Sequence, residues 1–364
     1  MKKIILITKT ALEKIPPVIS DLYILLDLGY RPSIIVTDIS DGLKKDLEEK
    51  GVTVHRIQDK HRFPIIGKLW SYYRFRRFCA KTAKEYATKS QPLLWIEGGH
   101  TILALGKSIK KYDYILQISE LHERSKLQLN AIRHVIHSAK AVFMPEYNRT
   151  VVYQVWFHLE KRPTVLPNKP YLLPSEEQLY KIKEKYTDTL SLLQGKKVIL
   201  YQGLIYPDRS PEKIVQAAKN VGGYQMLFVG RATPGMMDKL LSIDDSIIHI
   251  PFLPFPDYLI FATVAHIGCA FYKSDSLNNI FCAPNKINEY SAYSLPMIGN
   301  DIPGLKYLFE STGAGVVVDE NNIKSIEQGL KRLESDYAYY KSNANRIYNA
   351  YDTKKIVADT LNQL

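Results

Sequence analysis

Short apolar runs alternate with amphipathic segments along the whole chain. Ile4–Thr8 is nearly continuous in branched aliphatic residues, which is the pattern of a strand buried on both faces. In Val18–Leu28 apolar residues recur three or four positions apart, as on one face of a helix, and Gly29 ends that pattern. The same alternation predicts further strands at Ser33–Thr37, Val52–Ile57, Leu93–Glu97, Tyr114–Ser119 and Ala141–Met144. Strands separated by helices in this order indicate a parallel sheet covered on both faces.

A second series of strands and helices follows a proline-rich stretch. The prolines predict an extended linker over Arg162–Pro174, and Ser175 is the expected N-cap of the next helix. Strands are then predicted at Val198–Gln202, Gln225–Val229, Ile247–Ile250, Ile267–Phe271, Pro296–Ile298 and Gly315–Val318. We therefore expect an α/β protein with two doubly wound parallel-sheet domains, residues 1–168 and 169–344. A helix at about 345–364 should pack back on the first domain, and a central ligand cleft should lie at the carboxyl ends of both sheets.

The composition of the 364 residues, 46% apolar and 24% charged, is that of an ordinary globular chain. The three cysteines, Cys79, Cys269 and Cys282, are far apart and form no CxxC motif, so neither a disulfide framework nor a metal site is expected. The longest mostly apolar stretch, Tyr258–Tyr272, is shorter than the ~20 residues that span a bilayer. We expect a cytoplasmic protein, with peripheral attachment to the inner face of the cell membrane left open.

The net charge of +12 is concentrated in one segment. Between Lys60 and Lys89, nine cations face a single acid, so +8 of the total falls within 30 residues. In the long helix expected within Lys68–Ala87, four cations line one face with two aromatic residues beside them: Trp70, Tyr73, Arg74, Arg77, Lys81 and Lys84. Aromatic residues beside a cationic stripe suit docking on an anionic membrane. A solvated helix face is the equal alternative, and a nucleic-acid binder is a further one that no recognised motif accompanies.

Several motifs of nucleotide and hydrolase chemistry are missing from the sequence. There is no GxGxxG, which argues against a dinucleotide fingerprint, and no Gly-x-Ser-x-Gly elbow of a serine hydrolase. No Asp-x-Asp pair is present to hold a divalent ion against a nucleotide diphosphate. Any diphosphate should therefore be neutralised by cationic side chains and helix N-termini.

The most informative segment runs from Asn279 to Ile298. Its Pro284-Asn285 pair opens a predicted helix whose N-terminus can receive a phosphate, and Glu289 lies about one turn inside it. Taken alone, these features are more often those of an ordinary helix terminus with a solvated glutamate. However, the pattern Pro284-Asn285-Lys286-x-x-Glu289-Tyr290, with Asp301-Ile302-Pro303-Gly304 after it, resembles the C-terminal domain of family 4 glycosyltransferases (glycosyl transferases group 1) of the GT-B fold. The resemblance extends over roughly Lys197–Leu333.

The resemblance implies a donor site for a nucleotide-diphosphate sugar in the second domain. Glu289 corresponds to the family's ribose-binding glutamate, while Phe281 stands where the sugar-facing glutamate is expected, with Asn278 or Asn279 as replacement. After strand Val198–Gln202 the family carries two diphosphate-binding cations; here Leu204 occupies the first position and Arg209 the second. The remaining donor-site candidates are Gly203, Arg231, Lys273, Asn285 and Lys286, with Phe252 and Leu253 beside the base.

Acid–base candidates follow two strands of the first domain. His100 comes after Leu93–Glu97, and Glu120 and His122 come after Tyr114–Ser119. The resemblance implies a catalytic His or Asp after the second of these strands, so Glu120 and His122 are the leading acceptor-side residues. A lone histidine in a loop is more often structural, which is the alternative for each.

The resemblance implies a retaining glycosyltransferase that needs neither metal nor cofactor. It would move a sugar from a nucleotide sugar to a glycan or lipid-linked acceptor, in the synthesis of cell-surface polysaccharide or glycoconjugate. The first alternative is a catalytically inactive GT-B module that binds glycan or acts as a scaffold, since Phe281 and Leu204 replace family residues. The second is the basic nucleic-acid binder.

Overall fold

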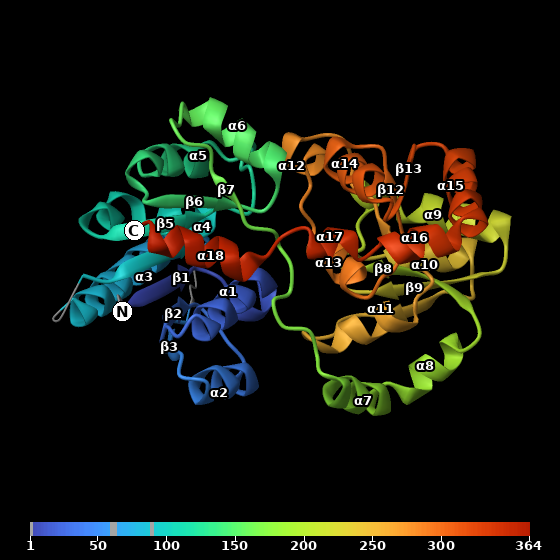
Figure 1. The fold of residues 1–364 in the computed structure, drawn as a ribbon, viewed down its shortest axis with the longest axis horizontal. Coiled ribbons are helices and arrows are strands. Elements are labelled where there is room, and N and C mark those ends of the chain that lie inside the picture. Colours follow the sequence, from blue (N-terminus) through green and yellow to red (C-terminus); the bar gives the residue numbers. More distant parts are fainter. Residues whose placement is uncertain (1–2, 59–63, 88–90) are drawn as a thin grey trace. The chain divides into compact units, whose positions relative to one another are not determined.

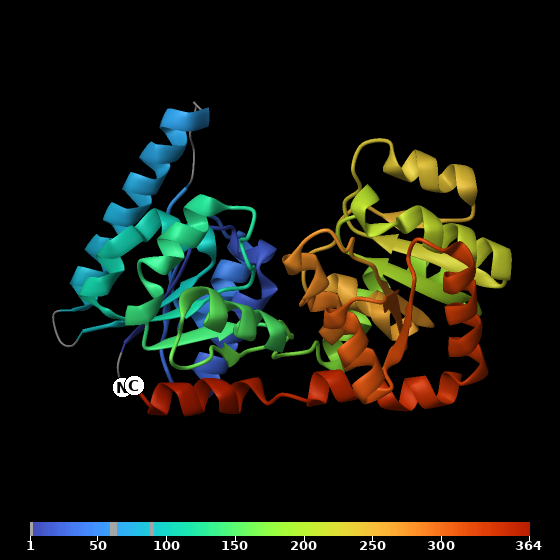
Figure 2. The same ribbon diagram turned by 90° about the horizontal axis from the view of Figure 1, so that it is seen from above.

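The computed structural model describes residues 3–58, 64–87 and 91–364. It divides into two compact units, Met1–Tyr171 with Asp352–Leu364, and Leu172–Tyr351. Lys60, Arg62 and Lys89 of the basic segment lie outside the described residues. Figures 1 and 2 show the two units as separate sheets with their helices.

The first unit is built on a parallel sheet. Seven strands of the described chain pair in the order β3-β2-β1-β4-β5-β6-β7. They are β1 (Ile4–Thr8), β2 (Ser33–Val36), β3 (Thr53–Arg56), β4 (Leu93–Glu97), β5 (Asp113–Gln117), β6 (Ala141–Met144) and β7 (Thr164–Val165). In the register, Leu6 of β1 lies opposite Ile34 on one side and Trp95 on the other. The order reverses between β1 and β4, so the carboxyl ends of these two strands form a topological switch point.

Helices cover both faces of this sheet. They are α1 (Pro16–Asp27), α2 (Asp41–Glu49), α3 (Pro64–Tyr86), α4 (Gly99–Leu105), α5 (Lys126–Arg133), α6 (Tyr147–Phe157) and α18 (Thr353–Asn362), with 3-10 turns η1 (Leu12–Lys14), η2 (Gly106–Lys111) and η3 (Ile136–Ser138). The rings of Trp95 and Phe143 pack 5.2 Å apart in the core under these helices. Figure 2 shows the amino-terminal part of α3 (blue) projecting beyond the other helices of this unit.

Two parts of the first unit differ from the sequence prediction. The segment Arg162–Pro174 was expected to be a linker throughout, but Thr164 and Val165 add a seventh strand to the edge of the sheet beside Phe143 and Met144. Helix α6, which was not predicted, leads into it. The apolar residues of α6 are spread around the helix, so its sequence lacks the one-sided pattern on which the prediction depended.

The second unit contains a second parallel sheet. In the described chain its order is β10-β9-β8-β11-β12-β13. These strands are β8 (Lys197–Gln202), β9 (Tyr224–Val229), β10 (Ile248–Ile250), β11 (Ile267–Ala270), β12 (Met297–Asn300) and β13 (Gly315–Val318). The order reverses between β8 and β11, which makes the carboxyl ends of these strands the switch point of this sheet. The predicted doubly wound α/β fold is confirmed in both units.

The helices of the second unit pack on both faces of its sheet, into two apolar clusters. They are α7 (Glu176–Lys185), α8 (Thr187–Leu193), α9 (Pro211–Val221), α10 (Met236–Ile243), α11 (Ile260–Val264), α12 (Leu277–Ile280), α13 (Asn285–Ala292), α14 (Pro303–Thr312), α15 (Ile323–Ser335), α16 (Tyr337–Asn343) and α17 (Arg346–Asn349), with 3-10 turns η4 (Pro207–Arg209) and η5 (Asp257–Leu259). Ser175 caps α7 as predicted, and Gln178 completes a capping box with it.

The C-terminal segment forms two helices rather than the single one expected at about 345–364. α17 contacts α13 and α14 in the second unit, whereas α18 lies on the first unit beside α1 (Figure 1). Asp352 lies between the two helices and caps the start of α18. Its carboxylate accepts a hydrogen bond from the Lys355 amide at 2.9 Å. No helix among the described residues has the length and apolar character needed to cross a membrane.

Candidate functional site

Helix α13 is fixed against the switch point of the second sheet by Tyr290. The Tyr290 hydroxyl donates to the Leu200 carbonyl at 3.2 Å and accepts from the Gln202 amide at 3.1 Å. Its ring crosses Gly268 of β11 so closely that a Cβ there would lie 2.4 Å from the ring. Because only glycine permits this approach, β8, β11 and α13 form one rigid frame. The frame sets the positions of Lys286 and Glu289, one turn apart on α13.

Lys286 is a buried cation without a hydrogen-bond partner. Its side chain is 6% exposed, and its Nζ is buried with no acceptor in reach. The ammonium lies 4.7 Å from the centre of the Tyr201 ring and beside the turn at Gly203. Burial, with Arg209 nearby, lowers its pKa to about 7. An unpaired ammonium in an apolar pocket is costly, which makes it a ready partner for an anion at this edge of the sheet.

Arg209 contributes a second cation at the same place. It ends the 3-10 turn η4, and its guanidinium lies over the Tyr272 ring at 4.6 Å. The Lys286 Nζ lies 5.8 Å from the centre of the same ring, so both cations contact Tyr272. The neighbouring turn is tight, because a Cβ on Gly230 would lie 1.9 Å from the Gly203 carbonyl oxygen. Two cations and a glycine turn at a switch point make an anion site suited to a diphosphate.

Glu289 is buried behind these cations. Tyr258 donates its hydroxyl to Oε1 at 2.8 Å, and Gln202 donates its amide to Oε2. Burial raises the pKa of Glu289 to about 7. Both carboxylate oxygens therefore already have protein partners, and a sugar hydroxyl would have to share them. Gln202 keeps its buried Oε1 without a partner, which leaves one acceptor for a ligand hydroxyl.

The other predicted donor-site residues surround this centre less closely. Arg231 and Phe252 contact each other at 4.8 Å after β9 and β10, and Leu253 lies half-buried beside them. Lys273 is exposed after β11 and forms an ion pair with Asp275 at 3.7 Å. Asn279 donates to the same carboxylate from α12 at 3.2 Å, and Asn285 is the first residue of α13. The structure thus brings Gly203, Arg209, Lys286 and Glu289 together, while the other six predicted residues lie in the loops and helix ends around them.

In the first unit His122 and His100 lie at the carboxyl edge of the sheet. His122 adopts a left-handed backbone conformation (φ 60°), and a Cβ on Gly99 would lie 2.5 Å from its Nε2. Burial first, then His100 and Arg149, lowers the pKa of His122 to about 4, so its ring is neutral at pH 7. Its Nε2 is buried without a hydrogen-bond partner. His100 is exposed on α4 with the Tyr72 hydroxyl 3.3 Å from its Nδ1.

Glu120, the third acid–base candidate, is 55% exposed in its side chain and lies 3.8 Å from the buried guanidinium of Arg149. The sequence prediction did not include Glu97, which ends β4 on the same edge. Glu97 is buried, accepts a hydrogen bond from the Thr8 hydroxyl at 2.8 Å, and has a raised pKa because of burial and the nearby Glu120. Its position at the end of a strand was visible in the sequence, but its burial was not.

Helix α3 presents the predicted basic stripe to solvent. The predicted docking residues recur at spacings that place them on one face of a helix, and all are exposed: Trp70, Tyr73, Arg74, Arg77, Lys81 and Lys84. The rings of Trp70 and Tyr73 stack at 5.5 Å, and Trp70 is 57% exposed. The opposite face buries Phe75, Cys79 and Ala83.

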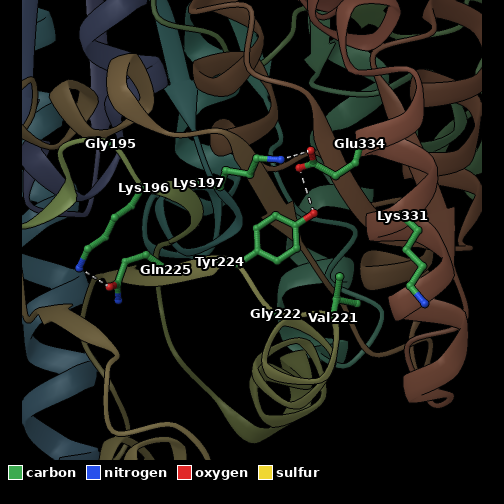
Figure 3. Close-up of a pocket in the computed structure, with 10 residues that line it drawn as sticks. Gly195, Lys196, Lys197, Val221, Gly222, Tyr224, Gln225, Lys331 and Glu334 are labelled. Carbon is green, nitrogen blue, oxygen red and sulfur yellow. Dashed lines mark hydrogen bonds and ion pairs between the residues drawn. The ribbon is translucent and has the colours of Figure 1, made fainter.

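One large cavity of the second unit does not coincide with the candidate site. It measures about 770 Å³ and lies at the amino ends of β8 and β9, at the opposite edge of the second sheet (Figure 3). Its polar groups are mostly paired, since Glu334 accepts from Lys197 and from Tyr224 and Lys196 donates to Gln225. Such satisfied groups form part of the scaffold. Within the described ranges no three His, Cys, Asp or Glu residues are grouped as metal ligands would be.

Comparisons with known proteins address the fold and the second unit. Residues 183–353 match the family model of glycosyl transferases group 1, which confirms the resemblance predicted from the motifs. Three solved structures share the fold along the whole chain. A sucrose-phosphate synthase from Thermosynechococcus elongatus is 14% identical, with a TM-score of 0.71 and coverage of 100% of this chain and 98% of its own.

The other two comparisons are with Anabaena and Rickettsia proteins. HepE from Anabaena, solved with UDP and glucose, is 13% identical, with a TM-score of 0.72 and full coverage of both chains. A glycosyltransferase from Rickettsia africae is 15% identical, with a TM-score of 0.66 and coverage of 100% and 95%. No curated protein sequence matches the chain significantly. Most of the second unit thus matches the family model of glycosyl transferases group 1, and the whole chain shares the two-domain GT-B fold of these solved structures.

Proposed function

We propose that the protein is a retaining glycosyltransferase that takes its sugar from a nucleotide-diphosphate sugar without a bound metal. The observation that carries the proposal is the buried, unpartnered ammonium of Lys286 with Arg209 beside it at the switch point of the second sheet. HepE, which shares the fold, has also been solved with UDP-glucose. UDP-glucose is therefore the first donor to test.

Lys286 and Arg209 would act on the leaving group. As the bond between the sugar and the diphosphate breaks, negative charge builds on the diphosphate while the sugar becomes oxocarbenium-like. The two cations are already oriented before the reaction, so they stabilise that charge without a costly rearrangement. They perform the neutralisation that a divalent ion performs in other transferases, which supports the metal-independent proposal.

The acceptor hydroxyl would form the new bond to the sugar and lose its proton. Glu120 and His122 are the proposed receivers of that proton on the protein, His100 is a further candidate, and the departing diphosphate is the alternative. The lowered pKa of His122 leaves its ring neutral at pH 7 and so able to accept a proton, and the Glu120 side chain is exposed to an incoming hydroxyl. We propose a glycan or lipid-linked acceptor, in cell-surface polysaccharide or glycoconjugate synthesis.

A membrane surface is the second proposed partner. The stacked Trp70 and Tyr73 rings lie on one face of α3 with Arg74, Arg77, Lys81 and Lys84. Exposed aromatic rings among cations suit the headgroup region of an anionic bilayer. Docking there would hold the protein beside a lipid-linked acceptor on the cytoplasmic side of the membrane.

The test of the donor site compares binding of UDP-glucose and release of its sugar in three variants. Lys286→Met and Arg209→Gln should each weaken binding or transfer about tenfold or more, since each removes a charge-assisted contact to phosphate. Lys331→Gln removes an exposed cation at the opposite edge of the same sheet and should leave both unchanged. Binding of a nucleotide sugar without transfer to any acceptor would favour the inactive module. Undisturbed binding and transfer in both donor-site variants would refute the assignment.

A further inference from the structure

A cationic hollow lies at the carboxyl ends of β1, β2 and β3 in the first unit. Its volume is about 440 Å³, and its charged lining consists of Lys9, Lys14, Arg56 and Asp38. A small second cavity, lined by Lys9, Thr37, Ser71 and Arg74 among others, lies next to it. The hollow is separate from the donor site, which belongs to the second unit.

The cations of the hollow exceed its acids. The acid of the hollow, Asp38, forms an ion pair with Arg56 at 2.5 Å. The side chain of Lys14 is exposed and forms no hydrogen bond or ion pair within the part of the chain that the structure describes. Lys9 is half-buried, with its Nζ 2.7 Å from the Ser71 hydroxyl and 5.2 Å from the centre of the Tyr72 ring. Cations gathered around one open hollow repel one another until an anion enters.

Backbone pairing beyond the ends of the strands makes the hollow rigid. The Thr37 amide donates to the Thr10 carbonyl at 3.2 Å, and the Leu12 amide donates to the Asp38 carbonyl at 2.9 Å. The loop that carries Lys9 and Lys14 is therefore tied to the loop that carries Asp38. Because these two loops are tied together, the cations of the hollow need little further ordering when a ligand binds.

Lys9 also links the hollow to the acid–base edge of the sheet. Its amide donates to the Thr101 hydroxyl at 2.8 Å, which ties the loop after β1 to α4. The preceding residue, Thr8, holds the buried Glu97. β1 and β4 flank the switch point of this sheet, where ligands of open α/β sheets bind. A molecule anchored by its anionic group in the hollow would thus extend toward Glu97 and His100.

We propose that this hollow binds a phosphoryl group carried by the acceptor. The proposal rests on the proposed transferase function, because it assigns the hollow to the acceptor. A phosphoryl group fits the chemistry, since its oxygens accept hydrogen bonds from several ammonium and guanidinium groups at once. The volume leaves room for more than a phosphate alone, as a phosphomonoester requires. The phosphoryl group belongs either to a lipid or to a soluble phosphomonoester.

The test is a calorimetric titration of the full chain, with saturating UDP present so that phosphate cannot occupy the donor site. Inorganic phosphate and glycerol 3-phosphate are the probes, and glycerol is the uncharged comparison. Lys14→Gln combined with Arg56→Gln should weaken binding of both phosphates about tenfold or more. Lys110→Gln combined with Lys111→Gln removes the same charge from exposed positions just before β5, at the amino edge, and should bind like the unchanged protein.

Vesicles distinguish the two sources of the phosphoryl group. The vesicle measurement uses the Arg77→Glu, Lys84→Glu background, so that the stripe on α3 contributes little. Retention on phosphatidic acid over phosphatidylcholine, lost with Lys14→Gln and Arg56→Gln, supports a lipid phosphate. Binding of glycerol 3-phosphate without such retention supports a soluble phosphomonoester.

Two results would overturn the proposal, and each is distinct from failure of the donor site. One is equal phosphate affinity in the hollow variant, in a Lys9→Met variant and in the unchanged protein. The other is no binding of phosphate or glycerol 3-phosphate at all. Failure of UDP-glucose to bind, with phosphate binding intact and lost in the hollow variant, would instead remove the proposed donor and leave an anion site.

Discussion

Lys286 and Glu289 have opposite charges yet the same cause for their pKa shifts. Both are buried on α13, and burial penalises the charged form of each. The pKa of Lys286 therefore falls to about 7 and that of Glu289 rises to about 7. Below pH 7 the pair offers an ammonium and a neutral carboxyl to an incoming diphosphate. Above pH 7 it offers a neutral amine and a carboxylate.

This predicts that donor affinity falls as the pH rises through 7. Deprotonation removes the cation and adds an anion, and both changes disfavour a bound diphosphate. The dissociation constant of UDP-glucose should rise by up to about tenfold per pH unit above 7 for each of these two protons that binding requires, because one pKa unit corresponds to 1.36 kcal/mol. Calorimetry between pH 6 and 9 measures this dissociation constant. UDP-glucose is the suitable probe because both of its phosphates are diesters that do not titrate in this range.

Two variants identify the groups responsible. Lys286→Met should bind weakly at pH 6 already and show a flatter profile, while Glu289→Gln should retain the dependence that Lys286 causes. An affinity of the unchanged protein that is constant from pH 6 to 9 would contradict the assignment of Lys286 to the diphosphate. So would a profile in Lys286→Met that is as steep as the profile of the unchanged protein.

At the scale of elements, α3 has two faces of opposite character, one buried and one exposed. Its inner face packs Phe75 and Cys79 into the first unit, and its outer face carries the aromatic and cationic stripe. Each cation near an anionic bilayer contributes about 1 kcal/mol. The Trp70 and Tyr73 rings would add an apolar contribution at the interface. On the proposed membrane docking, the stripe would support reversible attachment, which is weaker than the insertion of a spanning helix.

We predict that Arg77→Glu combined with Lys84→Glu lowers binding to phosphatidylglycerol vesicles at least about tenfold, since two attractive contributions become repulsive. Trp70→Ser with Tyr73→Ser should also weaken binding, with less dependence on salt. Co-sedimentation measures both. Lys110→Glu with Lys111→Glu changes the net charge equally at another edge of the unit and should have a smaller effect. Equal binding to vesicles and to an oligonucleotide would favour the nucleic-acid alternative instead.

The elements also show how far the sequence can predict this fold. The nearly continuous apolar runs of β1, β4 and β6 were located at their observed bounds, because such a run is itself the signal of a strand in a covered parallel sheet. β7 was missed since its two residues, Thr164 and Val165, carry no periodicity and are surrounded by prolines. Its pairing with β6 is a tertiary contact that no local pattern encodes.

The candidate site was predictable only in its outline. Family spacing identified Arg209, Lys286 and Glu289, and the structure brings these residues to one switch point. The partners Gln202, Tyr258 and Tyr272 were missed because they come from three different loops and strands. Their convergence on Glu289 and on the two cations depends on the packing of Tyr290 over Gly268. The sequence shows each residue but not the contact that aligns them.

At the scale of the whole molecule, the chain returns to its first unit at its C-terminal end. After the second unit ends at Tyr351, α18 places Val357 fully buried in the apolar cluster that contains Ile4, Leu22 and Trp95. Lys354 adds an ion pair with Asp27 of α1 at 2.5 Å. The first sheet thus completes its cover only when residues more than 180 positions beyond Tyr171 are in place.

This connectivity predicts that a change in α18 destabilises the first unit selectively. Val357→Ala removes two buried methyl groups and should lower the free energy of unfolding of that unit by about 1–3 kcal/mol, through lost apolar burial and the cavity left behind. Val155→Ala makes the same chemical change at an exposed position of α6 and should cost less than about 0.5 kcal/mol. Hydrogen exchange resolved to peptides should show faster exchange in β1, β2 and α1, with β8, β9 and α13 unaffected. Equal acceleration in both sheets would mean that the units unfold as one, and no acceleration in the first would mean that α18 does not support it.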